Sequence, residues 1–400
     1  MDTPVILFGA FDRHNFGDML FPHVAAAMLP EREPIFAGLA ERDLRAEGGH
    51  RVEALSAVAA RLGARPATLI HVGGEILSCD AWQAAVMLTP PDQAQRLVGA
   101  LDTRPREQRE WAARIVGTDA RAPYATAAHA AFRGPLRVVY LAVGGVELGA
   151  CDRALRAEVL AALAAADDLS VRDRRTQAQL QSAGIAARLV PDPAVMVAEL
   201  FGATLHARAG HGEVARLREA FPQGYLAVQF SADFGDDETL THLVAQLDRA
   251  CASTGLGVAL FRAGAAPWHD ELGALQRVAA RMRNGTAQVF PSLDLWDICA
   301  LVAAARGYCG SSLHGRIVAM AFALPRVNLR HPSARARTGK QAAFASTWDL
   351  AEMPSVVDVD DAAAAIEQAL AADPARLARV ATRLAARFRE ALAAMRERLG

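Results

Sequence analysis

The chain has 400 residues, of which 52% are hydrophobic and 22% charged, so it is long enough to form more than one domain around buried cores. Its 43 basic and 44 acidic residues leave a net charge of -1, which gives no overall attraction to nucleic acid or anionic membranes. Lys340 is the only lysine, so lysine Schiff-base chemistry has a single candidate amine, and a Walker phosphate loop is absent. Arginine must therefore bind any anion.

The cysteines and the N-terminus indicate the cellular compartment. Five cysteines lie far apart and never form a Cys-x-x-Cys pair, which predicts free thiols in a reducing cytoplasm rather than disulfides or a zinc site. The first residues lack a secretory signal, and no segment approaches the run of about 20 apolar residues that a membrane span needs. We expect a cytoplasmic protein with no bound metal, no nucleic-acid partner and at most peripheral membrane association. The oligomeric state stays open.

Short β-branched runs alternate along the chain with amphipathic, alanine-rich stretches, which is typical of βαβ units on a parallel sheet. Strands are predicted near 5–8, 68–72, 138–143, 169–172 and 188–190, and then near 225–230, 257–261, 287–290, 308–309 and 326–329. The stretch 205–223 is interpreted as the connection between the two series, and 374–399 as one long amphipathic helix.

This pattern predicts an α/β protein with two Rossmann-like domains facing a central cleft and a long C-terminal helix. The expected domains are residues 1–205 and 206–355, followed by a helical tail over 356–400 that packs on them. The tail could cross the cleft or only close its own domain.

Candidate site residues follow the predicted strands, because open parallel sheets bind ligands at the carboxyl ends of their strands. After the first strand come Asn15, Gly17 and Asp18, which are turn and N-cap types before a helix predicted to begin near Met19. The backbone N–H groups of such a helix start favour an anion or a hydroxyl oxygen. Capping without a ligand is the alternative.

Glycine pairs follow two neighbouring strands of the first series: Gly73 with Gly74, and Gly144 with Gly145. A glycine after a strand lets the backbone approach a ligand closely, although it also permits an ordinary tight turn. Two pairs at equivalent places favour a shared wall of a binding cleft.

Arg172 ends the fourth strand, where a guanidinium group can bind a phosphate or carboxylate with two hydrogen bonds. It could instead pair with Asp173 or Asp192.

In the second series, Ser311 and Ser312 lead into a helix with His314 and Arg316 in its first turn. A neutral imidazole there can accept a proton from a hydroxyl group while Arg316 binds an anion. A structural role is the alternative for a lone histidine.

Taken in order, these residues resemble the polysaccharide pyruvyl transferase family. The resemblance rests on five short motifs spread over most of the chain: Asn15-Phe16-Gly17-Asp18, Gly73-Gly74, Ser170-Val171-Arg172-Asp173, Asp192-Pro193 and Leu313-His314-Gly315. It implies a GT-B-like fold and transfer of a pyruvyl group from phosphoenolpyruvate to sugar hydroxyls, forming a ketal. Members of the family typically act in bacteria on precursors of cell-surface or exopolysaccharide chains.

By the same resemblance, Arg172, His314 and Arg316 bind phosphoenolpyruvate and act on it, with no separate cofactor, and the C-terminal domain is the donor side. The N-terminal domain is implied to bind the acceptor, a sugar or a lipid-linked glycan, with Asp18 or Asn15 orienting it. Ser312 stands where many members have an arginine, so Arg316 is the expected substitute.

Two other functions remain open. One is a GT-B glycosyltransferase using a nucleotide sugar, although residues 298–348 lack the acidic residue that usually holds the ribose. The other is a non-catalytic member that binds an anionic glycan. The same segment carries cations without any acid, which predicts a basic lobe and a loop over 333–339 that covers the site: Arg306, Arg316, Arg326, Arg330, Arg335, Arg337 and Lys340.

Overall fold

A computed structural model describes residues 3–29, 33–101, 103–334 and 339–399. The chain divides into two compact units, residues 1–193 with 387–400, and residues 194–386. The boundary therefore falls after Pro193 and not after residue 205. The stretch 205–223, interpreted from the sequence as a connection, belongs to the second unit and includes the end of helix α9 (Val197–Arg208) and helix α10 (Gly212–Ala220).

The first unit is built on an eight-stranded sheet with the order β3-β4-β2-β1-β5-β6-β7-β8. All neighbours are parallel except β3 and β4, which are antiparallel. The strands are β1 (Val5–Phe8), β2 (Ile35–Gly38), β3 (Arg42–Asp43), β4 (Arg51–Ala54), β5 (Ala67–His71), β6 (Leu136–Val143), β7 (Asp168–Val171) and β8 (Arg188–Leu189). Five of these strands were predicted, whereas β2, β3 and β4 were not.

The second unit contains a six-stranded sheet in which all strands are parallel, with the order β11-β10-β9-β12-β13-β14. Numbered within the unit, this is the Rossmann order 3-2-1-4-5-6, and the central strands of the first unit follow the same order. The strands are β9 (Tyr225–Gln229), β10 (Gly257–Leu260), β11 (Ala287–Val289), β12 (Gly307–Gly310), β13 (Arg326–Arg330) and β14 (Val356–Asp358). Only β14 was not predicted.

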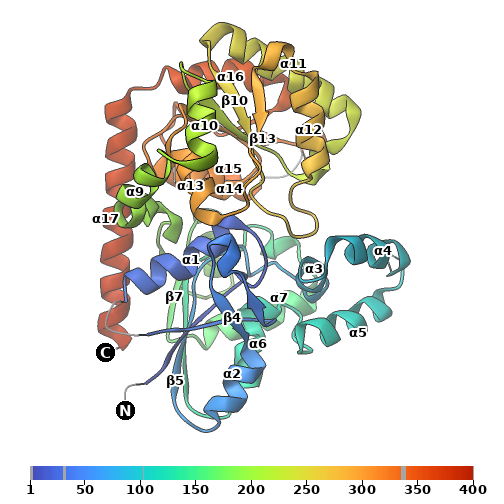
Figure 1. Cartoon of the computed structure of the whole chain (residues 1–400). Coiled ribbons are helices and arrows are strands. Elements are labelled where there is room, and N and C mark those ends of the chain that lie inside the picture. The colour runs from blue at the N-terminus through green and yellow to red at the C-terminus, as the bar shows by residue number, and fades with distance from the viewer. Residues whose placement is uncertain (1–2, 30–32, 102, 335–338, 400) are drawn as a thin grey trace. The chain divides into compact units, whose positions relative to one another are not determined.

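Helices connect the strands of both sheets and cover them, as Figure 1 shows for each unit. In the first unit they are α1 (Phe16–Ala27), α2 (Leu55–Leu62), α3 (Ala81–Met87), α4 (Pro91–Leu101), α5 (Pro105–Val116), α6 (Pro123–Ala131), α7 (Arg153–Ala164) and α8 (Arg174–Ser182). The second unit adds to α9 and α10 the helices α11 (Asp237–Thr254), α12 (Leu272–Arg281), α13 (Leu295–Ala303), α14 (Leu313–Ala321), α15 (Lys340–Trp348) and α16 (Ala362–Leu370).

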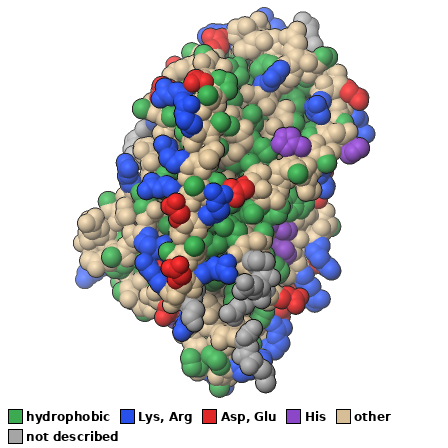
Figure 2. Space-filling model, turned by 90° about the vertical axis from the view of Figure 1, so that its left-hand side faces the viewer, with side chains coloured by type: hydrophobic (Ala, Val, Ile, Leu, Met, Phe, Trp, Pro, Cys, Tyr) green, Lys and Arg blue, Asp and Glu red, His purple; other side chains and the backbone are tan. Residues whose placement is uncertain are grey.

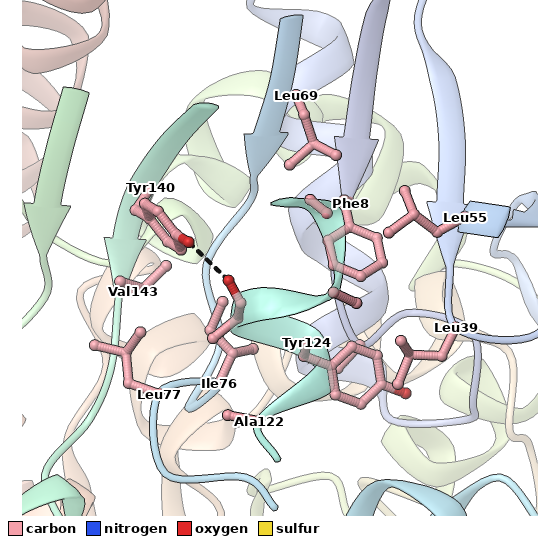
Figure 3. Close-up of a cluster of buried hydrophobic side chains, with 14 of the residues drawn as sticks. Phe8, Leu39, Leu55, Leu69, Ile76, Leu77, Ala122, Tyr124, Tyr140 and Val143 are labelled. Atoms are coloured by element: carbon pink, nitrogen blue, oxygen red, sulfur yellow. Dashed lines mark hydrogen bonds between the residues drawn. The ribbon is translucent and has the colours of Figure 1, made fainter. Parts of the chain in front are cut away.

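The core of the first unit is shown in Figure 3. Side chains of the central strands, such as Phe8, Leu69 and Val143, pack with residues of α6 and are almost completely buried. The hydroxyl group of Tyr140 donates a 2.7 Å hydrogen bond to the carbonyl oxygen of Ala125, so the buried phenol keeps a polar partner. This packing fixes the strand ends that carry the candidate residues.

The long C-terminal helix was predicted correctly as α17 (Pro374–Leu399). Its apolar side buries Leu377, Leu384, Phe388 and Leu392, and its residues up to 386 belong to the second unit. Figure 2 shows the face of the molecule that carries α17, where basic, acidic and hydrophobic side chains are interspersed. The helix therefore has the amphipathic character that its sequence indicates.

Candidate functional site

In each unit the strand order reverses between two central strands, which are β1 and β5 in the first unit and β9 and β12 in the second. Ligands of open parallel sheets bind at the carboxyl ends of the strands at such a switch point. Most of the candidate residues follow one of these four strands, and Gly144 and Arg172 follow β6 and β7 of the first sheet. The two groups are described separately, unit by unit.

The start of α1 lies at the switch point of the first unit. Asn15 is its N-cap, and its side-chain oxygen accepts hydrogen bonds from the backbone N–H groups of Gly17 (3.0 Å) and Asp18 (3.3 Å). The helix begins at Phe16 and not near Met19, so Gly17 and Asp18 lie in its first turn. The capping role left open by the sequence is therefore the observed one for Asn15.

The glycine pair after β5 packs against α1. Gly73 and Gly74 have φ angles of +113° and +90°, which glycine adopts far more readily than other residues. A Cβ atom on Gly73 would lie 3.2 Å from the ring of Phe21, and one on Gly74 would lie 3.6 Å from the carboxylate of Asp18. The structure thus brings the Gly73–Gly74 turn and the start of α1 together.

Asp12 was missed by the sequence reasoning and lies fully buried beside this switch point. Its carboxylate accepts hydrogen bonds from the backbone N–H groups of Leu39 (2.7 Å) and Ala40 (3.2 Å) and from the hydroxyl group of Tyr124 (2.6 Å). Burial raises the pKa of Asp12, and the nearby charge of Arg13 opposes this rise. Asp12 therefore connects β1 to the end of β2 and to α6.

Arg172 forms ion pairs with two carboxylates of the protein. Its guanidinium group pairs with Glu75 at 2.6 Å and with Asp192 at 2.9 Å, and its side chain is only 2% exposed. The neighbouring Gly144 leaves no room for a ligand, since a Cβ atom there would lie 2.4 Å from the Glu75 carboxylate. Of the two interpretations of Arg172, the geometry favours pairing with Asp192 over the expected contact with a donor.

The second half of the same motif is also structural. Asp173 is the N-cap of α8, and its carboxylate accepts a 2.7 Å hydrogen bond from the backbone N–H of Thr176 and a 2.9 Å hydrogen bond from its hydroxyl group. The Ser-Val-Arg-Asp and Asp-Pro motifs are thus joined by the Arg172–Asp192 ion pair and fix this edge of the sheet.

The start of α14 lies at the switch point of the second unit. Ser312 is its N-cap, and its hydroxyl oxygen accepts a 3.2 Å hydrogen bond from the backbone N–H of Gly315. A Cβ atom on Gly315 would lie 2.4 Å from the ring of Tyr308, so only glycine lets the first turn pack there. His314 stands between them, in the first turn and 8% exposed.

Two serines meet across this switch point. The hydroxyl oxygen of Ser311, after β12, accepts a 2.9 Å hydrogen bond from the backbone N–H of Ser231, after β9, and the two hydroxyl oxygens lie 3.1 Å apart. Gln229, the last residue of β9, accepts a 2.8 Å hydrogen bond from the backbone N–H of Ser312. Ser311 and Ser312 therefore lie where the sequence placed them, at a strand end beside a helix N-terminus.

Asp270 is a further group at this edge that the sequence reasoning missed. Its carboxylate accepts hydrogen bonds from the backbone N–H of Ala263 (2.5 Å) and from the side chain of Gln229 (2.7 Å). Burial raises the pKa of Asp270 to about 7, although these hydrogen bonds and the charge of Arg262 lower it. The second unit thus carries an acidic group that titrates near neutral pH next to the helix of His314.

Arg316 does not lie at the surface of the site, contrary to expectation. It is fully buried, with hydrogen bonds to the Asp349 carboxylate (2.6 Å), to the carbonyl oxygen of Ser355 (2.9 Å) and to that of Pro354 (3.0 Å). Burial lowers the pKa of Arg316, and the charge of Asp349 opposes this. Arg316 is therefore not placed to substitute for the arginine that Ser312 replaces.

The segment without acidic residues is not a free basic lobe, because acids just beyond it pair with its arginines. Asp349 also pairs with Arg326 at 2.5 Å, and Asp358 pairs with Arg330 at 2.7 Å. Burial raises the pKa of Asp349, but the charges of Arg316 and Arg326 outweigh this and hold it below its usual range. The part of the expected loop that contains Arg335 and Arg337 lies outside the described residues.

The described residues contain no group of three or more side chains that could hold a metal ion. None of the helices in this part of the chain has both the length and the apolarity of a membrane span. All five cysteines are free thiols.

Comparison with known families decides the identity of the chain. The family model described as polysaccharide pyruvyl transferase matches residues 115–333, which is more than half of the sequence. The chain belongs to the polysaccharide pyruvyl transferase family. As a member of this family it is a transferase, and the match includes the ion pair of Arg172 and the start of α14.

Solved structures with the same fold are sugar-nucleotide enzymes. The MnaA–UDP co-structure from S. aureus has a TM-score of 0.53 and 11% identity, and the match covers 96% of this pyruvyl transferase family member and 91% of that chain. The UDP-GlcNAc 2-epimerase from Methanocaldococcus jannaschii has a TM-score of 0.53 and 9% identity, with 92% of both chains covered. These likenesses show the fold, which is GT-B-like as predicted. A search of curated protein sequences finds no match.

Proposed function

We propose that this protein transfers a pyruvyl group from phosphoenolpyruvate to two hydroxyl groups of a sugar, forming a ketal. The observation that carries the proposal is the family match, which includes the serines and His314 at the switch point of the second unit. The acceptor is a precursor of a bacterial cell-surface polysaccharide or exopolysaccharide, and the reaction takes place in the cytoplasm. The second unit binds the donor and the first unit binds the acceptor.

The reaction needs no redox partner and no cofactor. The methylene carbon of phosphoenolpyruvate takes up a proton, and a sugar hydroxyl oxygen forms a bond to the adjacent carbon after losing its proton. The bond from this carbon to the phosphate oxygen breaks, and a second hydroxyl oxygen takes the vacated position. One hydroxyl proton thus ends on the new methyl group and the other on the released phosphate.

In this proposal His314 is the base that accepts the proton of the attacking hydroxyl group. Ser311 and Ser312 supply the polar wall beside it, with their positions fixed by Ser231 and Gln229. Asp18, in the first turn of α1, is preferred to Asn15 for orienting the sugar, because the side-chain oxygen of Asn15 already accepts two backbone hydrogen bonds.

The arginines are assigned differently from the sequence-based expectation. Arg172 and Arg316 act as structural cations, because each is buried against protein carboxylates. Binding of the donor phosphate therefore needs another cation of the second unit.

The test is release of inorganic phosphate from phosphoenolpyruvate in the presence of candidate sugar acceptors. His314→Ala is expected to lower the rate by about 100-fold or more, as loss of a general base does, while circular dichroism shows an intact fold. The control is His242→Ala, because His242 is an exposed residue of α11 that pairs with Asp360. Full activity of His314→Ala would overturn the assignment of the base.

The same assay separates the two other functions. Release of UDP or GDP from a nucleotide sugar, without turnover of phosphoenolpyruvate, would identify a glycosyltransferase. Binding of an acidic glycan without any phosphate release would identify a non-catalytic member.

A further inference from the structure

The loop after β10 displays two side chains that the proposed reaction has not used. It runs over residues 261–270 and ends at Asp270, whose backbone N–H donates to the carbonyl oxygen of Gly264 (3.2 Å). The Asp270 carboxylate accepts a hydrogen bond from the backbone N–H of Ala263. The backbone N–H of Ala232 donates a 2.6 Å hydrogen bond to the carbonyl oxygen of His269. These hydrogen bonds within the loop and to the segment after β9 give it a fixed conformation.

Trp268 lies near the end of this loop, in an unfavourable backbone conformation. Its φ angle is +64°, a left-handed conformation that costs free energy for a residue other than glycine, and its side chain is 49% exposed. The indole makes no ring contact among the described residues. A strained backbone that holds a large apolar side chain in water indicates that the chain is built to present this ring.

Arg262 is the second residue after β10, the strand that leads into the loop. Its Nε atom is buried without a hydrogen-bond partner, and its guanidinium group forms no ion pair within the described chain. The carboxylate of Asp270 is close enough for the two charges to interact, but no ion pair joins them, and its oxygens accept hydrogen bonds from Ala263 and Gln229. Strand-end arginines elsewhere are paired, as Arg330 is with Asp358. An N–H group left without a protein acceptor in this way is uncommon, so an oxygen atom of a ligand or of water is expected to fill the position.

Arg262 follows the carboxyl end of its strand, as Ser231 and Ser311 follow the carboxyl ends of theirs. Strand β9 lies between β10 and β12, and adjacent strands are about 4.8 Å apart, so a residue after β10 lies about 10 Å from one after β12. Arg262 therefore belongs to the same edge of the sheet as Ser231, Ser311 and His314. No ion pair joins Arg262 to a carboxylate among the described residues, although its charge lowers the pKa of Asp270.

We propose that the loop 261–270 is a phosphate-binding loop, in which Arg262 binds the phosphate group of a ligand and Trp268 packs against the organic part attached to it. A guanidinium group matches phosphate oxygens with two hydrogen bonds, and an indole offers a flat apolar surface to a sugar ring or an enol. The phosphate belongs to phosphoenolpyruvate or to a phosphorylated sugar acceptor. This choice of ligands rests on the proposed function, whereas binding of phosphate itself does not.

The test is isothermal titration calorimetry of the full chain in phosphate-free buffer with inorganic phosphate, phosphoenolpyruvate and glucose 1-phosphate. Arg262→Ala is expected to weaken the binding of every phosphate ligand that the native protein binds by about 10-fold or more, as loss of a charge-assisted contact does. Arg249→Ala, which removes an exposed arginine of α11 in the same unit, is expected to bind like the native protein. Unchanged affinity in Arg262→Ala, or no phosphate binding by the native protein, would overturn the proposal.

Trp268→Ala then identifies the source of the phosphate. The variant is expected to keep the native affinity for inorganic phosphate. Its affinity for the organic phosphate that the loop binds is expected to fall by about 5-fold. A loss confined to glucose 1-phosphate assigns the loop to the acceptor, and a loss confined to phosphoenolpyruvate assigns it to the donor. A Trp268→Ala variant that binds all three ligands like the native protein would overturn the role of the indole.

His314→Ala separates this inference from the proposed reaction. It is expected to lose phosphate release from phosphoenolpyruvate and to keep the affinity for inorganic phosphate. If the native protein binds phosphate through Arg262 but never turns over phosphoenolpyruvate, the proposed function fails and the phosphate-binding loop stands.

Discussion

The carboxyl edges of the two sheets carry arginines in similar positions but leave them in different states. In the first unit Arg172 follows β7 and is buried between the carboxylates of Glu75 and Asp192. In the second unit Arg262 follows β10 and has no such partner among the described residues. An arginine after a strand thus predicts a ligand contact only if no carboxylate from another segment reaches it first.

Removing each arginine tests most directly whether Arg172 is structural and Arg262 is not. Arg172→Ala is expected to lower the free energy of unfolding of the first unit by about 3–5 kcal/mol, because Glu75 and Asp192 would remain buried without their cation. Arg262→Ala is expected to change it by less than about 0.5 kcal/mol, because Arg262 is only half-buried and its removal leaves no carboxylate without an ion-pair partner. Urea denaturation measures both, and a similar loss in the two variants would show that Arg262 also has a structural role.

A second prediction concerns the space around Arg172. In Gly144→Ala the added Cβ atom would lie 2.4 Å from the Glu75 carboxylate and 2.7 Å from Nε of Arg172, so the ion pair must shift. We expect a loss of about 1–3 kcal/mol in the free energy of unfolding, as for overpacked cores. Gly99→Ala on α4 is the control, because nothing lies within 4 Å of its added Cβ atom. A Gly144→Ala protein as stable as this control would contradict the close packing.

At the carboxyl edge of the second unit's sheet, the protonation of Asp270 is expected to make stability depend on pH. Burial raises the pKa of Asp270 to about 7 from an ordinary value of 3.8. Between these values the folded protein keeps a proton that the unfolded chain has lost, so stability falls as the pH rises from about 4 to 7. Because Asp270 is only partly buried, we expect the fall to be about 1–2 kcal/mol.

Asp270→Asn isolates this contribution. Urea denaturation at pH 5 and pH 8 is expected to show a smaller decrease in stability for the variant than for the native protein, since asparagine does not titrate. An equal decrease in both proteins would assign the pH dependence to other groups.

The smallest expected effects concern the two helix starts at the switch points. Asn15→Ala and Ser312→Ala each remove an N-cap, which costs about 1 kcal/mol. We expect the larger decrease in melting temperature for Asn15→Ala, because Asn15 caps two backbone N–H groups and Ser312 caps one. Unchanged melting temperatures in both variants would show that packing alone holds these helix starts.

Much of the architecture follows from local sequence patterns. The alternation of β-branched and amphipathic segments predicted ten of the strands and the helix α17, because both patterns depend on periods of a few residues. The strands β2, β3, β4 and β14 escaped prediction, and each is held in its sheet by pairing with a neighbouring strand.

The sequence predicted the positions of the candidate site residues better than the role of each residue. The residues after β1, β5 and β12 were found because turn and capping residues mark strand ends. Arg262 carries the same signal, one residue beyond a predicted strand end, and applying the rule to every strand would have found it. Asp270 had no such signal, because its place at this edge depends on Gln229, which lies 41 residues away in the sequence.

The α/β class, the family resemblance, the strand ends and the residue types available there can be predicted from the sequence, because they depend on local spacing and chemistry. Which charges are neutralised depends on tertiary contacts. Asp192 lies 20 residues from Arg172 and Asp349 lies 33 residues from Arg316, and folding brings each pair into contact in the protein interior. Burial then makes an unpaired charge costly, so these arginines are used by the fold, and Arg262 remains for a ligand.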